Sequence, residues 1–271
     1  MDGTSPRLWP YAVNNSPLPL PQRPVLFTSR AVIELAPPDE AWDEAVSLDV
    51  NGLLAYADGY HANGIALSAL LSQAGAEPLE GRRPILLQGE LANPYRLQEM
   101  GMSAMPLLPV RLEDLCRTWA DGLDARDSYP GIHHVTLART PGWWEMAIIG
   151  LATSDQLKAI RAWLDNGKPH VWRPVKLAEG GLRLERGELQ PPEANDVEWD
   201  GQTERVTRAS PAPTGPRLDL DAVLVVVHTR LGCYNHRGRL ARCVHIQQRP
   251  FHENLFRKGS SYRWDDVLSV R

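Results

Sequence analysis

The chain has 271 residues, 43% of them hydrophobic and 23% charged, and this composition excludes a fully disordered or fibrous protein. Its 29 basic and 33 acidic side chains give a net charge of −4, so it lacks the basic excess of a general nucleic-acid-binding protein. Three cysteines, an odd number, do not make the framework of a secreted disulfide-rich domain. The longest apolar run, 222–227, is too short to cross a bilayer. We therefore expect a cytoplasmic protein without nucleic-acid or membrane partners, whose oligomeric state the sequence does not set.

Residues 1–38 form a proline-rich arm. Proline fixes φ and removes a backbone donor, so we expect neither a regular helix nor a central strand there. The arm carries Trp9, Tyr11 and Phe27 among its prolines. We expect these aromatic side chains to hold the arm extended on the body of the protein, and a disordered tail is the alternative.

Residues 39–83 have helical periodicity and are expected to form an N-terminal helical extension. Asp39 can cap a first helix whose apolar face would carry Ala41, Trp42, Ala45 and Val46. A second helical segment is expected at 51–73, broken near Gly59 or Gly64. The pair would add a helical layer to the rest of the chain.

From residue 84 onward the pattern changes to short strands and short helices. The strands are expected at 84–88, 107–112, 133–138, 145–151, 171–177 and 182–185, with a turn at 140–142. The helices are expected from Asn93 to Met102, after the capping box Thr153–Gln156, and at 263–270. Residues 191–216 are expected to be a long surface loop. The fold class is therefore α+β: a small mixed β-barrel or curled sheet with short helices, plus the N-terminal helical layer.

Histidines and cysteines gather late in the sequence, in two β-branched segments at 221–229 and 240–248. A hairpin between them would set His228 opposite His245 on one face. Together with Cys233 these imidazoles could bind zinc. The alternative is a structural pair of partly buried histidines, and we expect no metal and no cofactor.

The segment 86–94, Leu-Leu-Gln-Gly-Glu-Leu-Ala-Asn-Pro, resembles the opening of the γ-glutamylcyclotransferase-like family. That opening is a strand, a Tyr-Gly-Ser-Asn loop and a helix. Further elements follow in the family's order: a strand with Arg111, the turn Pro141–Gly142, a helix beginning Asp155-Gln156-Leu157, and a strand at 225–229. The resemblance covers about 84–271. It implies an enzyme that forms 5-oxoproline from γ-glutamyl compounds, in a cavity beside the loop.

The resemblance also implies a set of site residues. The loop of the family falls on Gln88, Gly89, Glu90 and Leu91, and only the glycine is retained. The family's catalytic glutamate falls at about Leu164, next to Asp165. The candidate catalytic residues are therefore Glu90 and Asp165, and the candidate substrate-binding residues are Gln88, Gly89, Leu91, Asn93 and Arg111.

These departures leave two functions open. The first is a diverged enzyme whose 5-oxoproline-forming activity is weak or absent. The second is a non-catalytic module that binds a small molecule or a protein in the old cavity. A carboxylate pointing into the cavity beside Gly89 would favour the enzyme, whereas a cavity filled by Leu91, Leu164 and tryptophan side chains would favour the binding module.

Overall fold

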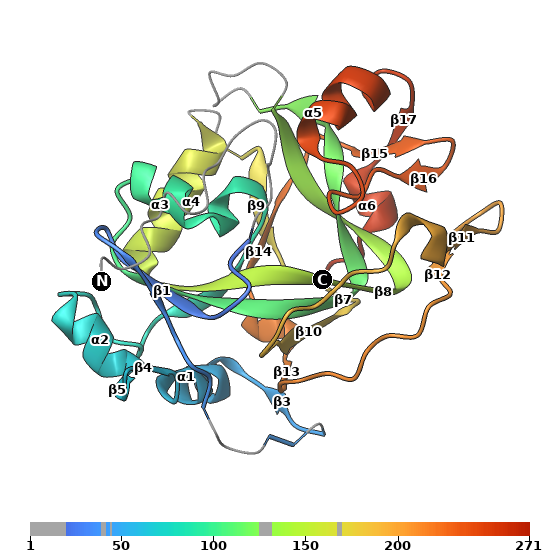
Figure 1. Cartoon of the computed structure of the whole chain (residues 1–271). Helices are drawn as coiled ribbons and strands as arrows, with labels where there is room; N and C mark the ends of the chain where they lie inside the picture. The colour runs from blue at the N-terminus through green and yellow to red at the C-terminus, as the bar shows by residue number, and fades with distance from the viewer. Residues whose placement is uncertain (1–19, 39–41, 44, 125–131, 167–169) are drawn as a thin grey trace.

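A long antiparallel ribbon of two strands, β7 (Met105–Leu123) and β8 (His133–Ala152), runs through the molecule (Figure 1). The computed structural model describes residues 20–38, 42–43, 45–124, 132–166 and 170–271. The ribbon supplies the centre of an 11-stranded mixed sheet, to which the other strands add on both sides. The chain is thus α+β, as expected, with few and short helices.

Nine further strands complete this sheet. They are β1 (Val25–Phe27), β2 (Val32–Glu34), β3 (Ser47–Leu48), β6 (Arg83–Leu87), β10 (Gly181–Leu184), β13 (Arg217–Leu218), β15 (Cys233–His236), β16 (Arg239–Leu240) and β17 (Ser260–Tyr262). β6 pairs with β8, whereas β1, β10 and β15 pair with successive parts of β7. The path of paired strands runs from β16 to β3 without returning on itself, so of the two expected forms, a β-barrel or a curled sheet, the described part of the chain does not form a closed barrel.

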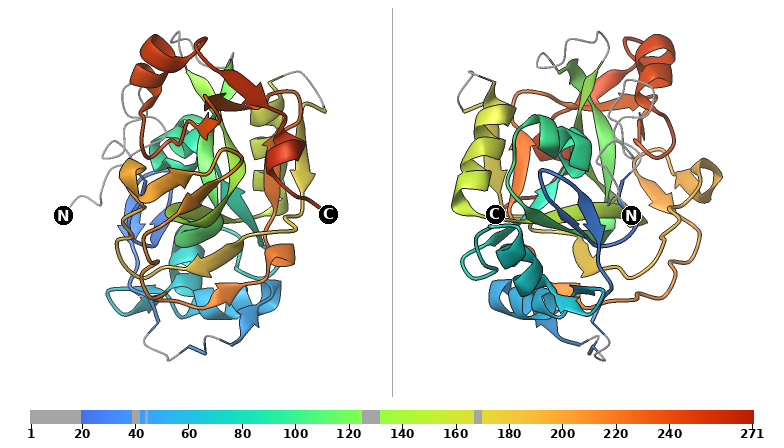
Figure 2. Two further views of the ribbon diagram at one scale, coloured as in Figure 1. Left: turned by 90° about the vertical axis from the view of Figure 1, so that its right-hand side faces the viewer. Right: turned by 60° about the vertical axis from the view of Figure 1, so that its left-hand side comes forward.

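Helices cover both faces of one end of the ribbon. α1 (Val50–Asp58) and α2 (Leu67–Gln73) lie on one face, and α3 (Pro94–Glu99) and α4 (Ser154–Asp165) lie on the other (Figures 1 and 2). Successive side chains of a strand point to opposite faces. Accordingly Leu108 packs in the core with α1 and α2, and its neighbour Leu107 packs in the core with α3 and α4. Because both faces are buried, these strands are continuous apolar runs in the sequence.

A β-bulge separates this end of the ribbon from the other. The register shifts between Glu113 and Leu115, and four residues of β8, 140–143, have no opposite partner. Asp114 and Gly142 both have positive φ, 58° and 75°, and the Gly142 N–H donates to Asp114 Oδ1 at 2.7 Å. The Thr-Pro-Gly signal was expected to reverse the chain between two strands. It instead forms a bulge within one strand of 20 residues. Residues at positive φ, such as Asp114 and Gly142, occur both in reverse turns and in β-bulges, so the sequence signal is the same for the two.

The far end of the ribbon is covered by the last forty residues of the chain (Figure 2). They contain the hairpin β15/β16, a short helix α5 (Gln248–Pro250) continued by a π-helical turn Phe251–Leu255, and α6 (Trp264–Val267). The expected hairpin between residues 221–229 and 240–248 is not formed. β14 (Val225–His228) pairs with β9 (Trp172–Val175), which sets His228 opposite Trp172 and away from His245.

The N-terminal region departs from expectation in its helices. The described residues around the first expected helix, 42–43 and 45–46, are not helical, and Asp39 and Ala41 lie outside the described residues. The segment expected at 51–73 with a break near Gly59 or Gly64 is confirmed: α1 and α2 are separated by a small hairpin, β4 (His61–Ala62) and β5 (Ile65–Ala66), because Asn63 and Gly64 at positive φ form a tight turn. Of the expected N-terminal helical layer, the described residues therefore contain the two short helices α1 and α2 and not the first helix.

The arm contributes a hairpin to the sheet. β1 pairs with both β2 and β7, and Phe27 is fully buried. Trp9 and Tyr11 lie outside the described residues. The region expected as a loop at 191–216 also has structure, a 3₁₀ turn Ala194–Asp196 and the hairpin β11 (Val197–Trp199) and β12 (Glu204–Val206). Among the described residues, every helix is too short or too polar to pass through a lipid bilayer.

Candidate functional site

The loop that carries the family resemblance is a buried 3₁₀ helix, Gly89–Ala92, between β6 and α3. Gly89 has φ +56°, and an added Cβ would lie 3.4 Å from Val135 Cγ2, so a turn that favours glycine packs directly on β8. Asn93 follows as the N-cap of α3, and its Oδ1 accepts from the Tyr95 N–H at 2.8 Å. The expected strand, glycine turn and Asn-Pro helix start are therefore confirmed, and the Asn93 side chain is engaged in capping.

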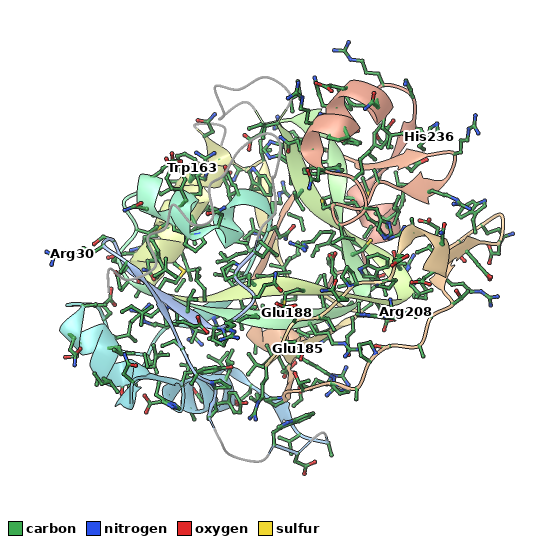
Figure 3. The ribbon with its side chains drawn as sticks, in the orientation of Figure 1. Arg30, Trp163, Glu185, Glu188, Arg208 and His236 are labelled. Atoms are coloured by element: carbon green, nitrogen blue, oxygen red, sulfur yellow. The ribbon has the colours of Figure 1, made fainter. Side chains whose placement is uncertain are left out.

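Glu90 is the most constrained of the predicted site residues. Its side chain is 6% exposed. Its Oε1 accepts from the Trp163 indole Nε1 at 2.8 Å, and its Oε2 lies 2.8 Å from Arg96 Nε. The Arg96 guanidinium also lies 5.6 Å from the centre of the Trp163 ring, on α4 (Figure 3). Glu90 therefore connects the glycine turn to both α3 and α4.

The space beside the glycine turn is small. We call it the Gly89 cavity, and Gln88, Gly89, Glu90 and Leu91 line it from the turn. Leu164 and Trp172 line it from the opposite side. About 30 Å³ remains open, which is room for about one or two water molecules. Leu91, Leu164 and Trp172 are among the side chains that bound this small space.

A larger space opens next to it. We call this space, of about 300 Å³, the histidine cleft. It shares the lining residues Asp124, His134, Leu164 and Trp172 with the Gly89 cavity, so the two spaces are adjacent. Among the described residues, the charged and titratable groups that line the cleft are Asp124, His134, Asp165, His228 and Arg230.

The two candidate catalytic carboxylates lie in different spaces. Glu90 lines the Gly89 cavity, whereas Asp165, at the end of α4, lines the histidine cleft. Asp165 Oδ1 lies 3.5 Å from the Trp172 N–H nitrogen, and Oδ2 lies 3.9 Å from Arg161 Nε. The structure therefore does not bring Glu90 and Asp165 together as one acid–base pair.

Two of the candidate substrate-binding residues hold the fold together. Arg111 is buried, and its guanidinium lies 3.0 Å from Glu113 Oε1 and donates to Pro211 O at 2.7 Å and to Ser210 Oγ. It thereby anchors the long segment before β13. Gln88 lines the Gly89 cavity, but its Nε2 donates to Val226 O at 3.1 Å and so ties β6 to β14.

Three aromatic rings cluster in the histidine cleft. His134 and His228 have ring centres 5.3 Å apart, and Trp172 lies 5.3 Å and 5.1 Å from them. Asp124 Oδ2 lies 3.6 Å from His134 Nδ1. Sequence reasoning missed this group, because β8, β9 and β14 bring its members together from distant parts of the chain. The one available signal was the His133–His134 pair before a strand.

The expected histidine–cysteine group is dispersed. His245 Nε2 lies 2.8 Å from Pro192 O, and Cys233 Sγ lies 2.9 Å from Thr118 Oγ1. Burial raises the pKa of the Cys233 thiol to about 12, so the thiolate that a metal requires is disfavoured. In the part of the chain that the structure describes, no three histidine, cysteine or acidic side chains are placed to hold a metal ion.

The site therefore consists of a nearly filled cavity with a paired carboxylate and an open cleft with two imidazoles. The first corresponds to the loop that resembles a cyclotransferase, and the second to a group that the resemblance does not include. Comparisons of the chain with protein families, with curated proteins and with solved structures found no match.

Proposed function

We propose that this chain is a diverged γ-glutamylcyclotransferase-like protein in which 5-oxoproline formation is weak or absent. The observation that carries the proposal is the engagement of Glu90 by Arg96 and Trp163. A general base must come within about 2.6–3.2 Å of the proton that it takes. A carboxylate whose two oxygens already hold a guanidinium and an indole would have to leave both to reach a substrate amine.

The volume of the Gly89 cavity supports the same proposal. A γ-glutamyl group has nine non-hydrogen atoms, whereas the cavity of about 30 Å³ accepts about one or two water molecules. Leu91, Leu164 and Trp172 would have to move before such a group could enter. Close-packed side chains of this kind resist rearrangement, because each loses its contacts when it moves.

The loop also lacks the polar groups that the resemblance implies. Gln88 donates its amide to the backbone of β14, and Leu91 has no polar atom in its side chain. A positioned base contributes about 10²–10⁴-fold to such a reaction, and donors at the developing oxyanion about 10²–10³-fold. Both contributions are expected to be impaired together.

The second candidate function is a non-catalytic module that binds a small molecule. The open histidine cleft of about 300 Å³ favours it, because small-molecule sites are concave and combine apolar walls with few polar groups. We propose the cytoplasm as its compartment, which the three free cysteines support.

The test is release of 5-oxoproline from γ-glutamyl-alanine and from glutathione. We expect no turnover above background with the wild type, Glu90→Gln or Asp165→Asn. Glu99→Gln is a matched control, because Glu99 contacts the same Arg96 guanidinium at 2.7 Å but is exposed. Robust turnover that Glu90→Gln or Asp165→Asn abolishes and Glu99→Gln preserves would overturn the proposal. Calorimetric titration with the same compounds tests the binding module, which predicts saturable binding that Asp165→Asn weakens.

A further inference from the structure

A separate open space of about 430 Å³ lies between the hairpin β11/β12, the turn that joins β15 to β16, and the segment from β17 to α6 (Figure 1). We call it the Trp199 cavity. The four segments that line it, 139–141, 199–204, 238–240 and 262–267, all lie within the described ranges. None of the described residues that line it also lines the Gly89 cavity or the histidine cleft, so the function proposed above does not use it.

The hairpin β11/β12 carries Trp199 to the wall of this cavity. Trp199 lies directly opposite Glu204, so the two side chains are on one face of the hairpin. Glu204 is buried, and its Oε2 accepts from the Leu240 N–H at 3.0 Å. Its two carboxylate oxygens also accept from the Arg242 guanidinium at 3.2 and 3.1 Å. This buried, two-point ion pair fixes the hairpin, and with it Trp199, against the β15/β16 turn.

Gly238, in that turn, is the point at which two aromatic side chains meet. It has φ +83°, and an added Cβ would lie 2.8 Å from Trp199 Cζ2, so the indole packs directly on the glycine. From the β17 side, the Tyr262 hydroxyl lies 3.4 Å from Gly238 O. Trp199 and Tyr262 are both half-buried, and both line the cavity. The cavity therefore presents two aromatic rings whose positions the turn fixes.

Most of the charge that lines the cavity is balanced from outside it. The ionic lining groups among the described residues are Arg139, Glu204 and Asp266. Arg139 lies 3.0 Å from Glu179 Oε2, and Glu204 is paired with Arg242. Two of the three charges thus already have a partner of opposite sign.

Asp266, at the start of α6, supplies the remaining charge. Its carboxylate is exposed, and within the described chain it makes no hydrogen bond. The guanidinium of Arg263 interacts with it electrostatically but forms its hydrogen bonds with Asp265, at 2.7 and 3.0 Å. The cavity therefore has a net negative charge, located beside two aromatic rings.

We propose that the Trp199 cavity binds a trimethylammonium group. Such a cation is attracted to the faces of tryptophan and tyrosine rings, and its methyl groups need no hydrogen-bond acceptor. Asp266 would balance its charge, and Leu240 and Val267 supply apolar wall for the methyl groups. A metal cation would instead need several oxygen ligands, and an uncharged ligand such as a sugar would gain nothing from the Asp266 charge.

Choline and its uncharged isostere 3,3-dimethyl-1-butanol test the proposal on the full-length protein. The two molecules have nearly the same shape, because a quaternary carbon replaces the quaternary nitrogen, and they differ in charge. We expect calorimetric titration to show saturable binding of choline and about tenfold or weaker binding of the alcohol. Equal affinity for the two molecules, or no binding of choline at millimolar concentration, would overturn the proposal.

A second pair of probes distinguishes the source of the cation. A peptide that contains trimethyllysine should bind about tenfold more tightly than the same peptide with unmodified lysine, and equal binding of the two would count against the proposal. Tighter binding of the methylated peptide than of choline would support a protein side chain as the natural ligand, and the reverse order a free small molecule. These probes contain no γ-glutamyl group, so their outcome is separate from that of the diverged cyclotransferase.

Point variants locate the binding. We expect Trp199→Leu to weaken choline binding about tenfold and Asp266→Asn about threefold, whereas Tyr262→Phe keeps the ring and should have little effect. Asp265→Asn is the matched control, because it removes the same charge from the neighbouring position, where the carboxylate pairs with Arg263 and does not line the cavity. Asp266 is exposed, so its variant is expected to fold. Unchanged choline affinity in Asp266→Asn, or an equal loss in Asp265→Asn, would overturn the proposal.

Discussion

The two ends of the β7/β8 ribbon are built from different kinds of side chain. In the apolar half, β7 residues 107–110 pair with β8 residues 147–150, and the side chains on both faces are aliphatic. In the polar half, residues 115–119 pair with 135–139 and Leu123 pairs with His133, and a buried arginine, two threonines and a histidine are mixed with the apolar residues. The core around one end of these two strands is thus stabilised by hydrophobic burial alone. The core around the other end also requires hydrogen-bond and ion-pair partners for its buried polar side chains.

Buried ion pairs mark the polar half. Glu145 is fully buried, and its Oε1 accepts from the Arg117 N–H at 2.6 Å and from Arg117 Nε at 3.1 Å. Arg242 makes two contacts with Glu204, at 3.2 and 3.1 Å, and its guanidinium lies 4.8 Å from the centre of the Trp143 ring. Charges are costly to remove from water, so each carboxylate depends on its arginine. The bulge lies between the two regions, and Glu145 on its apolar side reaches Arg117 on its polar side.

The largest effect should come from breaking one of these pairs. Arg117→Met leaves the Glu145 carboxylate buried with only the backbone N–H of residue 117 among the contacts described above. We expect a loss of about 3–5 kcal/mol in the free energy of unfolding, measured in urea by tryptophan fluorescence. The double variant Arg117→Met with Glu145→Leu is the control, because it removes both charges and should recover most of the loss. A loss below about 1 kcal/mol in the single variant would show that the polar half does not depend on this pair.

The second-largest effect should be a dependence of the free energy of unfolding on pH. The aliphatic side chains of the apolar half do not titrate, so they cannot contribute to it. Burial, and then the neighbouring His252, lower the pKa of His133 to about 4. The unfolded chain has the ordinary value of about 6.5, so it binds the proton first as the pH falls. Stability is therefore full above about pH 6.5 and declines between about pH 6.5 and 4, by about 2–3 kcal/mol.

Urea unfolding at a series of pH values checks this expectation. His133→Phe should flatten the decline, because phenylalanine has no proton to bind in either state. A decline of the same size in His133→Phe would assign the pH dependence to other groups.

The smallest effect should be in the apolar half. Ile149→Val removes one methyl group from a fully buried position, and we expect a loss of about 0.5–1.5 kcal/mol. The remaining side chains keep apolar neighbours, so no charge is left without a partner. A loss as large as that of Arg117→Met would show that the two halves do not differ in the way their side chains suggest.

The same comparison explains which parts of the fold the sequence predicts. Apolar runs predict the strands at 84–88, 107–112 and 145–151, which β6, β7 and β8 confirm. The capping box at Thr153 and the Asn93–Pro94 start likewise predict α4 and α3, because these signals depend only on near neighbours. Where partners are distant, as for Arg117 and Glu145, the sequence contains no local trace of the pairing.

The site follows the same pattern. The glycine turn was predicted, and the predicted residues Gln88, Gly89, Glu90 and Leu91 line the Gly89 cavity because they lie on that one short segment. The salt bridge of Glu90 was not, and neither was the histidine cleft. Asp124, His134 and His228 come from the ends of β7, β8 and β14, and the predicted register of His228 against His245 was wrong. Only the observed pairing of β14 with β9 places His228 beside Trp172.

All three thiols of the chain are buried around the polar half, in the clusters next to β7, β8 and β15. Burial raises the pKa of Cys116 to about 11 and that of Cys243 well above its usual value. Alkylating reagents attack thiolates, so labelling of the native protein must wait for this region to open. Because all three thiols lie there, iodoacetamide incorporation followed by mass spectrometry measures how often the polar half opens. Opening of the apolar half exposes no thiol and is not detected. The rate of thiol alkylation thus reports the rate at which one end of the sheet opens locally.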